Sequence, residues 1–144
     1  MTIYPHEATA LHHYLHSRMD PAVAARVEER VRANAAAVGR MTDDEHRCST
    51  LPCAFLEGNA CSAYAVRPAA CAGYHSPRRE DCEHSFNNPT DTRFPLPQVD
   101  ELADYSDAVH AGIDEAYLRK ELDGERLELH TAVNALLKNN WNLP

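Results

Sequence analysis

Apolar residues recur at helical spacing in two stretches near the N-terminus, separated by a short polar break. The first stretch predicts a helix over residues 7–18. The break contains Asp20 followed by Pro21, the pattern of an N-cap and a first helical residue, which predicts a second helix over 21–39. The apolar positions are Ala8, Leu11 and Leu15 in the first helix and Val27, Val31, Ala35 and Val38 in the second.

The helical pattern returns near the C-terminus. It predicts a helix over 98–122 and, after the break at Asp123-Gly124, a last helix over 125–139. The apolar positions are Leu102, Val109, Ile113 and Ala116 in the former and Leu129, Val133, Leu136 and Leu137 in the latter. A polar tail follows, and we expect it either to fray or to dock through Trp141.

The stretch between these two helical regions, residues 40–97, has no sustained period and is punctuated by proline. The prolines are Pro52, Pro68, Pro77, Pro89, Pro95 and Pro97. We therefore expect a loop-rich insert with only a short helical turn around 68–72. A loop of this length inside a compact domain needs a cross-link to hold it. The prediction is a mainly α single domain over 1–144, with about four helices around a central cysteine cluster.

Composition and charge exclude several classes of function. The chain has 144 residues, and its 14 Lys and Arg against 22 Asp and Glu give a net charge of −8. Such a surface is unsuited to phosphate backbones, so we expect no nucleic-acid or anionic-membrane partner. The sequence shows neither a signal peptide nor a run of about 18 apolar residues. These features predict a cytoplasmic protein.

Five cysteines lie between residues 48 and 82 and none lies elsewhere. An odd number of thiols in a reducing compartment does not indicate a disulfide framework. Thiolates bind zinc and iron–sulfur clusters strongly, and a bound metal would supply the order that a loop without a core lacks. No pair has the tight C-x2-C spacing. The other reading from the residues alone is a set of small, reduced, buried thiols.

The order of these residues resembles a family signature. The segments C-A-F-L at 53–56, C-S-A-Y at 61–64 and R-P-A-A-C at 67–71, followed by Cys82, are similar to the pattern C-P-F-L, C-x-I-Y, R-P-x-x-C-R and a further Cys. That pattern marks the YkgJ-like family of zinc- or iron-chelating cysteine-cluster proteins. The resemblance covers about 48–84 and implies that the four cysteines of the pattern are metal ligands. These are Cys53, Cys61, Cys71 and Cys82. It implies no reaction.

The chain departs from the family pattern at several points. Ala54, Ala63 and Ala72 stand where the family has proline, isoleucine and arginine. The family also carries a further run of the C-x2-C-x2-C-C kind before its first helix, which this chain lacks because its cysteines start at Cys48. Either upstream ligands are missing or one self-sufficient site remains. The abrupt start MTIYPHEA favours the first explanation.

Other residues are secondary candidates for metal binding. Cys48 is a fifth thiol where a tetrahedral zinc takes four ligands, and His75 and His84 lie in the same segment and could complete a mixed site. His12 and His16 stand four apart on one helix face, the spacing that brings two imidazoles to one metal. The sequence offers that pair no third ligand, so we interpret it as a solvated polar face.

Three functions follow from these observations. The first is a metal-binding protein that holds zinc or iron for metal handling or for a protein partner that the sequence does not identify. The second is an oxidoreductase or electron carrier built on an iron–sulfur cluster. The third is a thiol redox sensor in which Cys48 and Cys53 cycle between dithiol and disulfide. We favour the first, since the sequence shows no phosphate loop, nucleophile elbow or nucleotide fingerprint that would indicate an enzyme.

Overall fold

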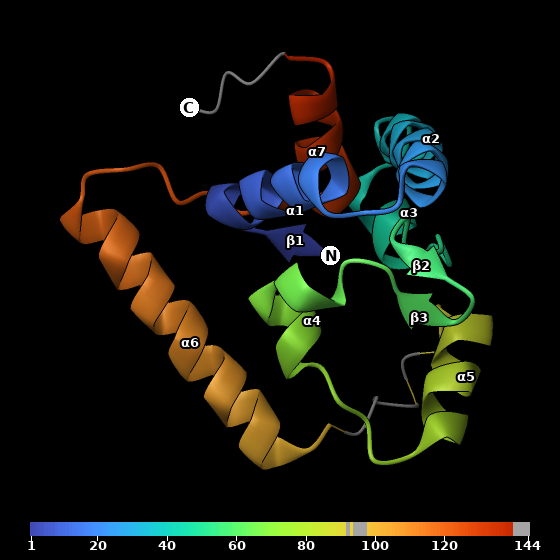
Figure 1. Ribbon diagram of the computed structural model, residues 1–144. Coiled ribbons are helices and arrows are strands. Elements are labelled where there is room, and N and C mark those ends of the chain that lie inside the picture. Colours follow the sequence, from blue (N-terminus) through green and yellow to red (C-terminus); the bar gives the residue numbers. More distant parts are fainter. Residues whose placement is uncertain (92, 94–97, 140–144) are drawn as a thin grey trace.

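The computed structural model describes residues 1–91, 93 and 98–139 and is mostly helical, as predicted (Figure 1). The helices of the described residues are α1 (Pro5–Ser17), α2 (Pro21–Val38), α3 (Asp43–Arg47), the 3-10 turn η1 (Tyr64–Val66), α4 (Ala69–Gly73), α5 (Arg79–Asn87), α6 (Asp100–Arg119) and α7 (Leu129–Leu137). The strands are β1 (Thr2–Ile3), β2 (Leu56–Glu57), β3 (Ala60–Cys61) and β4 (Leu127–Glu128).

Helices α1, α2 and α7 pack together and form the main core. The predicted stripes of the two N-terminal helices are confirmed, because their central apolar residues are buried. These are Ala8, Leu11 and Leu15 in α1 and Val27, Val31 and Ala35 in α2. The predicted cap of α2 is also confirmed: Asp20 Oδ1 accepts the backbone N–H groups of Ala22 and Val23 at 2.9 and 3.1 Å.

The last helix was predicted over 125–139, but it begins later, at Leu129. Residues 127 and 128 are extended and pair antiparallel with β1, in the register Thr2↔Glu128 and Ile3↔Leu127. The N–H of Leu129 then donates to the carbonyl of Met1 at 3.0 Å, and α7 begins there. Pairing with the N-terminal strand satisfies backbone groups that a helix would otherwise use. Because of this pairing, Glu128 becomes the N-cap of α7.

The predicted loop-rich insert contains more structure than expected. Within 40–97 the chain forms α3, the β2–β3 hairpin, η1, α4 and α5, and it contributes Ala54, Phe55 and Ala63 to the main core. Gly58 and Asn59 both have positive φ, +53° and +67°, which is the two-residue turn that suits the twist of a hairpin. Burial of these side chains therefore supplies order that the sequence analysis assigned to metal binding alone.

Helix α6 carries the predicted apolar stripe but does not join the core. None of its residues is buried, and it packs mainly along α4. The approach is close: a Cβ added to Gly73 of α4 would stand 2.3 Å from the Cβ of Ser106. A second link joins α6 to the start of α1, where the Tyr4 hydroxyl donates to Asp114 at 2.8 Å.

The predicted arrangement of four helices around a central cysteine cluster is also wrong. Seven α-helices occur in the described residues, and the cysteine-bearing segment lies on one side of the α1–α2–α7 group, as Figure 1 shows. The roles expected for Pro95, Pro97 and Trp141 fall outside the described residues. In the described part of the chain, none of the helices combines the length and the apolar character that a membrane crossing requires.

Candidate metal and thiol site

The five cysteines stand on different elements and all are free thiols. Cys48 caps the C-terminus of α3, Cys53 lies just before β2, Cys61 ends β3, Cys71 lies in α4 and Cys82 lies in α5. Cys48 and Cys53 are exposed as whole residues, and the other three are half-buried.

Two of the predicted ligands act on the thiol of a third. Burial, together with the thiols of Cys53 and Cys61, raises the pKa of the Cys71 thiol to about 11, because a second negative charge is unfavourable beside the first. The thiols of Cys53, in a loop, and of Cys61, in a strand, therefore act on the thiol of Cys71 in a helix. We call Cys53, Cys61 and Cys71 the thiol group.

The position of Cys71 depends on a buried carboxylate that the sequence analysis did not single out. Glu7 in α1 is only 8% exposed. Its Oε2 accepts the N–H of Tyr4 at 2.9 Å, and its Oε1 accepts the N–H of Ala69 at 2.7 Å. The first turn of α4 is therefore hydrogen-bonded to α1, which fixes the helix that carries Cys71.

Cys53 has a partner that the sequence analysis also missed, His130 in α7. Burial raises the pKa of the Cys53 thiol, but hydrogen bonds from the His130 ring and from the Phe55 N–H outweigh burial and lower it below its usual value. Burial lowers the pKa of His130, but its hydrogen bonds with Cys53 and Glu128 outweigh this and raise it to about 9. Thiol and imidazole thus stabilise each other's charged forms.

Glu128 holds the other side of the His130 ring. The distance from His130 Nδ1 to Glu128 Oε1 is 2.9 Å, and Glu128 Oε2 accepts the N–H of Thr131 at 2.8 Å. Burial raises the pKa of Glu128, but the bonds from His130 and Thr131 outweigh it and lower the pKa to about 2. The order Cys53, His130, Glu128 is the arrangement in which a carboxylate orients an imidazole toward a sulfur.

The prediction of a helix over 125–139 concealed this pair. Residues two apart point to different sides of a helix, whereas in an extended segment they share a face. Glu128 is extended and precedes the first turn of α7, so its carboxylate can reach the ring of His130. The E-L-H spacing was the available signal, and it can be interpreted only once the strand is known.

A cavity of about 560 Å³ opens beside Cys53 and His130. Its lining includes Cys53, Cys71, Glu128 and His130. Next to Cys53, the Nε of Arg30 donates to the carbonyl of Ala54 at 2.9 Å. In the described part of the chain, no three His, Cys, Asp or Glu side chains stand in a ready coordinating arrangement.

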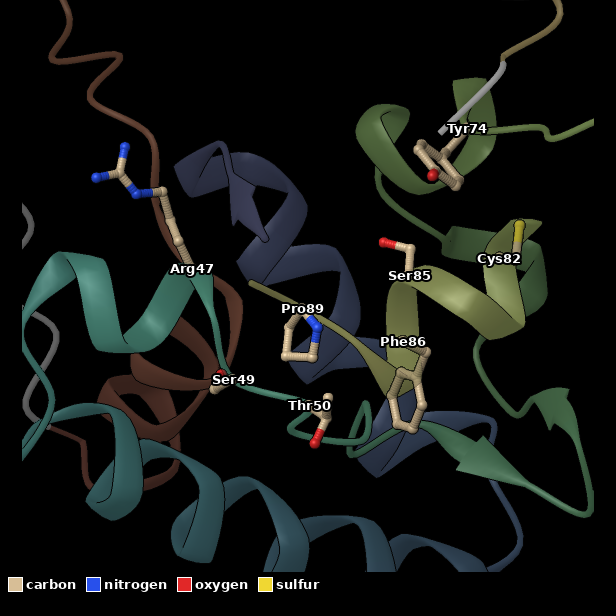
Figure 2. A pocket seen from close by; sticks show the side chains of 8 residues that line it. All are labelled: Arg47, Ser49, Thr50, Tyr74, Cys82, Ser85, Phe86 and Pro89. Atoms are coloured by element: carbon tan, nitrogen blue, oxygen red, sulfur yellow. The ribbon is translucent and has the colours of Figure 1, made fainter. Parts of the chain in front are cut away.

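Cys82, the fourth ligand implied by the family pattern, lines a neighbouring cavity of about 310 Å³. Figure 2 shows Cys82 and Tyr74 on one side of this cavity and Arg47 on the other. Burial raises the pKa of Tyr74, and the Cys82 thiol adds to the rise, so these two groups interact. The two cavities share Arg47 and Ser49 in their linings and are therefore adjacent.

The remaining ligand candidates of the insert have other interactions. His75 is exposed, and its Nε2 lies 2.9 Å from the carbonyl of Ala72. His84 Nε2 lies 3.4 Å from Asp91 Oδ2. Neither contact involves a cysteine. Cys48, expected as a spare ligand or a redox partner of Cys53, is exposed at the end of α3.

The histidine pair of α1 lies beside α2. His12 Nε2 and His16 Nε2 are 3.1 Å apart, and His16 Nδ1 is 3.7 Å from Glu28 Oε1. Burial, with the neighbouring His16, lowers the pKa of His12. His16 is exposed, which agrees with the predicted solvated polar face.

Comparison of the chain with protein-family models, with curated proteins and with solved structures finds no match. The functional argument therefore depends on the residues themselves.

Proposed function

We propose that this protein is a metal-binding protein that chelates one zinc or iron ion through Cys53, Cys61 and Cys71. The observation that supports the proposal is that Cys53 and Cys71, on two separate elements, line one cavity, and that the thiols of Cys53 and Cys61 both help to raise the pKa of Cys71. Structural zinc sites commonly draw their sulfur ligands from segments that are not adjacent in the chain.

The electrostatics of the thiol group favour a cation. Three thiolates near one another repel, and a divalent metal removes that repulsion while replacing their protons. The structure contributes some positive charge of its own. The Arg67 guanidinium lowers the pKa of Cys71, though less than burial and the other thiols raise it, and the same group stacks 4.5 Å from the ring centroid of Tyr64. Arg67 therefore fits a role as a counter-charge beside the ligands.

The metal's role, on this proposal, is to fasten together segments that already have a core. Phe55 and Ala54 anchor one end of the insert and Glu7 anchors α4. Cys53 and Cys61 flank the first anchor and Cys71 follows the second, so a metal bound by all three would fix the hairpin against α4. The same surface could serve metal handling or a protein partner.

The test is metal analysis of the full chain purified without oxygen and again in air. We expect one equivalent of zinc or iron in the wild type and its loss in Cys61→Ser and Cys71→Ser. Cys48→Ser is the matched control, because Cys48 is an exposed thiol outside the group. Metal-free wild type after reconstitution with zinc and with iron, with all thiols reactive, would contradict the proposal. An oxygen-sensitive brown colour would instead identify an iron–sulfur cluster and the second class of function.

A second candidate function, thiol redox sensing, is favoured by one observation. The sulfur of Cys53 is hydrogen-bonded to His130, and Cys71 lines the same cavity. A peroxide could oxidise this pair to a disulfide, the two thiols giving up two protons and two electrons and the peroxide leaving as two waters. The pair would then be Cys53 and Cys71 rather than Cys48 and Cys53. Peptide mapping after peroxide treatment of metal-free protein distinguishes these pairings.

A further inference from the structure

Helix α6 presents an apolar face that the described elements leave largely open. Figure 1 shows α6 along one edge of the molecule, with α4 beside it. Tyr105 and Leu102 are 69% and 39% exposed, and Ala116 is exposed as well. These residues belong to one stripe at helical spacing, which we call the α6 face. It consists of Leu102, Tyr105, Val109, Ile113 and Ala116.

The α6 face carries an exposed aromatic ring at one end and an apolar cavity at the other. Tyr105 and Ala116 are eleven residues apart. Three helical turns hold about 10.8 residues, so the two lie on the same side of α6, about 16 Å apart. The cavity at the Ala116 end has a volume of about 400 Å³ and is lined by His6, Ile113, Ala116, Tyr117, Lys120 and Leu122. A second α6 that runs in the opposite direction would place each ring over the other copy's cavity.

The charges beside the α6 face fit the same antiparallel arrangement. Glu101 and Arg119 are eighteen residues apart, which is about five turns, so both lie along one edge of the face. In an antiparallel pair centred near residue 110, Glu101 of each copy meets the partner's Arg119. Glu101 has no ion-pair partner among the described residues. Arg119 is held by Glu115 at 2.6 Å, and its guanidinium has further N–H groups for a second carboxylate.

We propose that α6 is the interface of a homodimer, in which two copies of this chain pack antiparallel with Tyr105 of each in the cavity beside the partner's Ala116. Such an interface uses the same surface on both copies, as closed two-fold dimers do. The first half of α6 is acidic, with Asp100, Glu101, Asp104 and Asp107, which disfavours an anionic membrane as the occupant of this face. The inference does not depend on metal binding.

The experiment is sedimentation equilibrium of the full chain over a range of concentrations. A reducing buffer with a chelator ensures that neither disulfides nor bound metal link two copies. We expect a wild-type dimer that Tyr105→Ala weakens by about 100-fold or more, because a symmetric interface loses the aromatic ring twice. Leu118→Ala is the matched control and should dimerise as the wild type does. Leu118 is 78% exposed on the same helix, but its position is about 140° around the helix from Tyr105.

A charge exchange tests the antiparallel direction. Glu101→Lys and Arg119→Glu each place like charges together at both ends of the interface, so each alone should weaken dimerisation by about 10-fold. A mixture of these two variants should dimerise as tightly as the wild type, because both contacts then join opposite charges. Glu83→Lys changes the net charge as Glu101→Lys does but lies on α5, so it should have no effect.

Two results would overturn the inference. The first is a wild type that remains monomeric up to about 1 mM, where even a weak pair forms, which would leave the α6 face to a different partner. The second is a dimer that Tyr105→Ala does not weaken, or one that mixing the two charge variants does not restore. Circular dichroism of each variant checks that it is folded.

Discussion

Phe55 provides the sharpest test of how the cysteine-rich segment is held. Its side chain is 2% exposed and belongs to the core formed by α1, α2 and α7, although it lies only two residues after Cys53. An aromatic side chain buries about 150 Å² or more, and at about 25 cal/mol/Å² this corresponds to about 4 kcal/mol. Measured core Phe→Ala substitutions cost about 3–5 kcal/mol. We expect Phe55→Ala to lose this amount.

The assay is urea unfolding followed by circular dichroism, in the presence of a chelator so that metal binding does not contribute. With a denaturant slope of about 2 kcal/mol/M, the loss moves the midpoint down by about 2 M. Phe86→Ala is the matched control, because Phe86 is 53% exposed on α5. That variant should stay within about 0.5 kcal/mol of the wild type.

Equal midpoints for the two variants would refute the reasoning, since they would show that Phe55 is not buried in the metal-free chain. The segment around the thiol group would then depend on metal for its order, as the sequence alone suggested. A lower midpoint for Phe55→Ala alone shows that burial holds this segment before any metal binds.

Two further predictions concern the contacts of α6. Burial, with the hydrogen bond to Asp114, raises the pKa of Tyr4 to about 12, so this tyrosine should titrate after the others in an alkaline absorption titration. Its stabilising effect is complete below the ordinary tyrosine pKa of about 10 and is lost as the pH rises toward about 12, so stability should fall over that window. A Tyr4 that titrates with the other tyrosines would contradict the contact. Gly73→Ala places a Cβ where Ser106 stands and should cost about 1–3 kcal/mol in urea unfolding, as overpacking does. Gly112→Ala is the control, since a Cβ there meets nothing within 4 Å and the change should be neutral or stabilising.

The sequence predicted the helices whose apolar faces are continuous. The stripes of α1 and α2 could be predicted because each buries one face against a single core, and the Asp20-Pro21 start is a local signal. The apolar stripe of α6 has the same helical spacing as those of α1 and α2, yet none of the residues of α6 is buried. Periodicity shows that a helix has an apolar face, but it does not show how deeply the neighbouring elements cover that face.

The candidate site was predicted only in part, for a similar reason. Cysteine content and order pointed to Cys53, Cys61, Cys71 and Cys82; the thiols of the first two act on that of Cys71, whereas Cys82 lines a neighbouring cavity. Glu7 and His130 could not be predicted, because their roles depend on contacts across the chain, to Ala69 in one case and to Cys53 in the other. The Gly58-Asn59 turn was a local hairpin signal in a segment interpreted as irregular.

The most direct measurement of the central claim is the X-ray absorption spectrum of the chain loaded with one equivalent of zinc. If Cys53, Cys61 and Cys71 share the ion, the first shell will contain three sulfur atoms at about 2.3 Å. A first shell made only of nitrogen and oxygen atoms would contradict the account, because the metal would then be bound away from the thiol group.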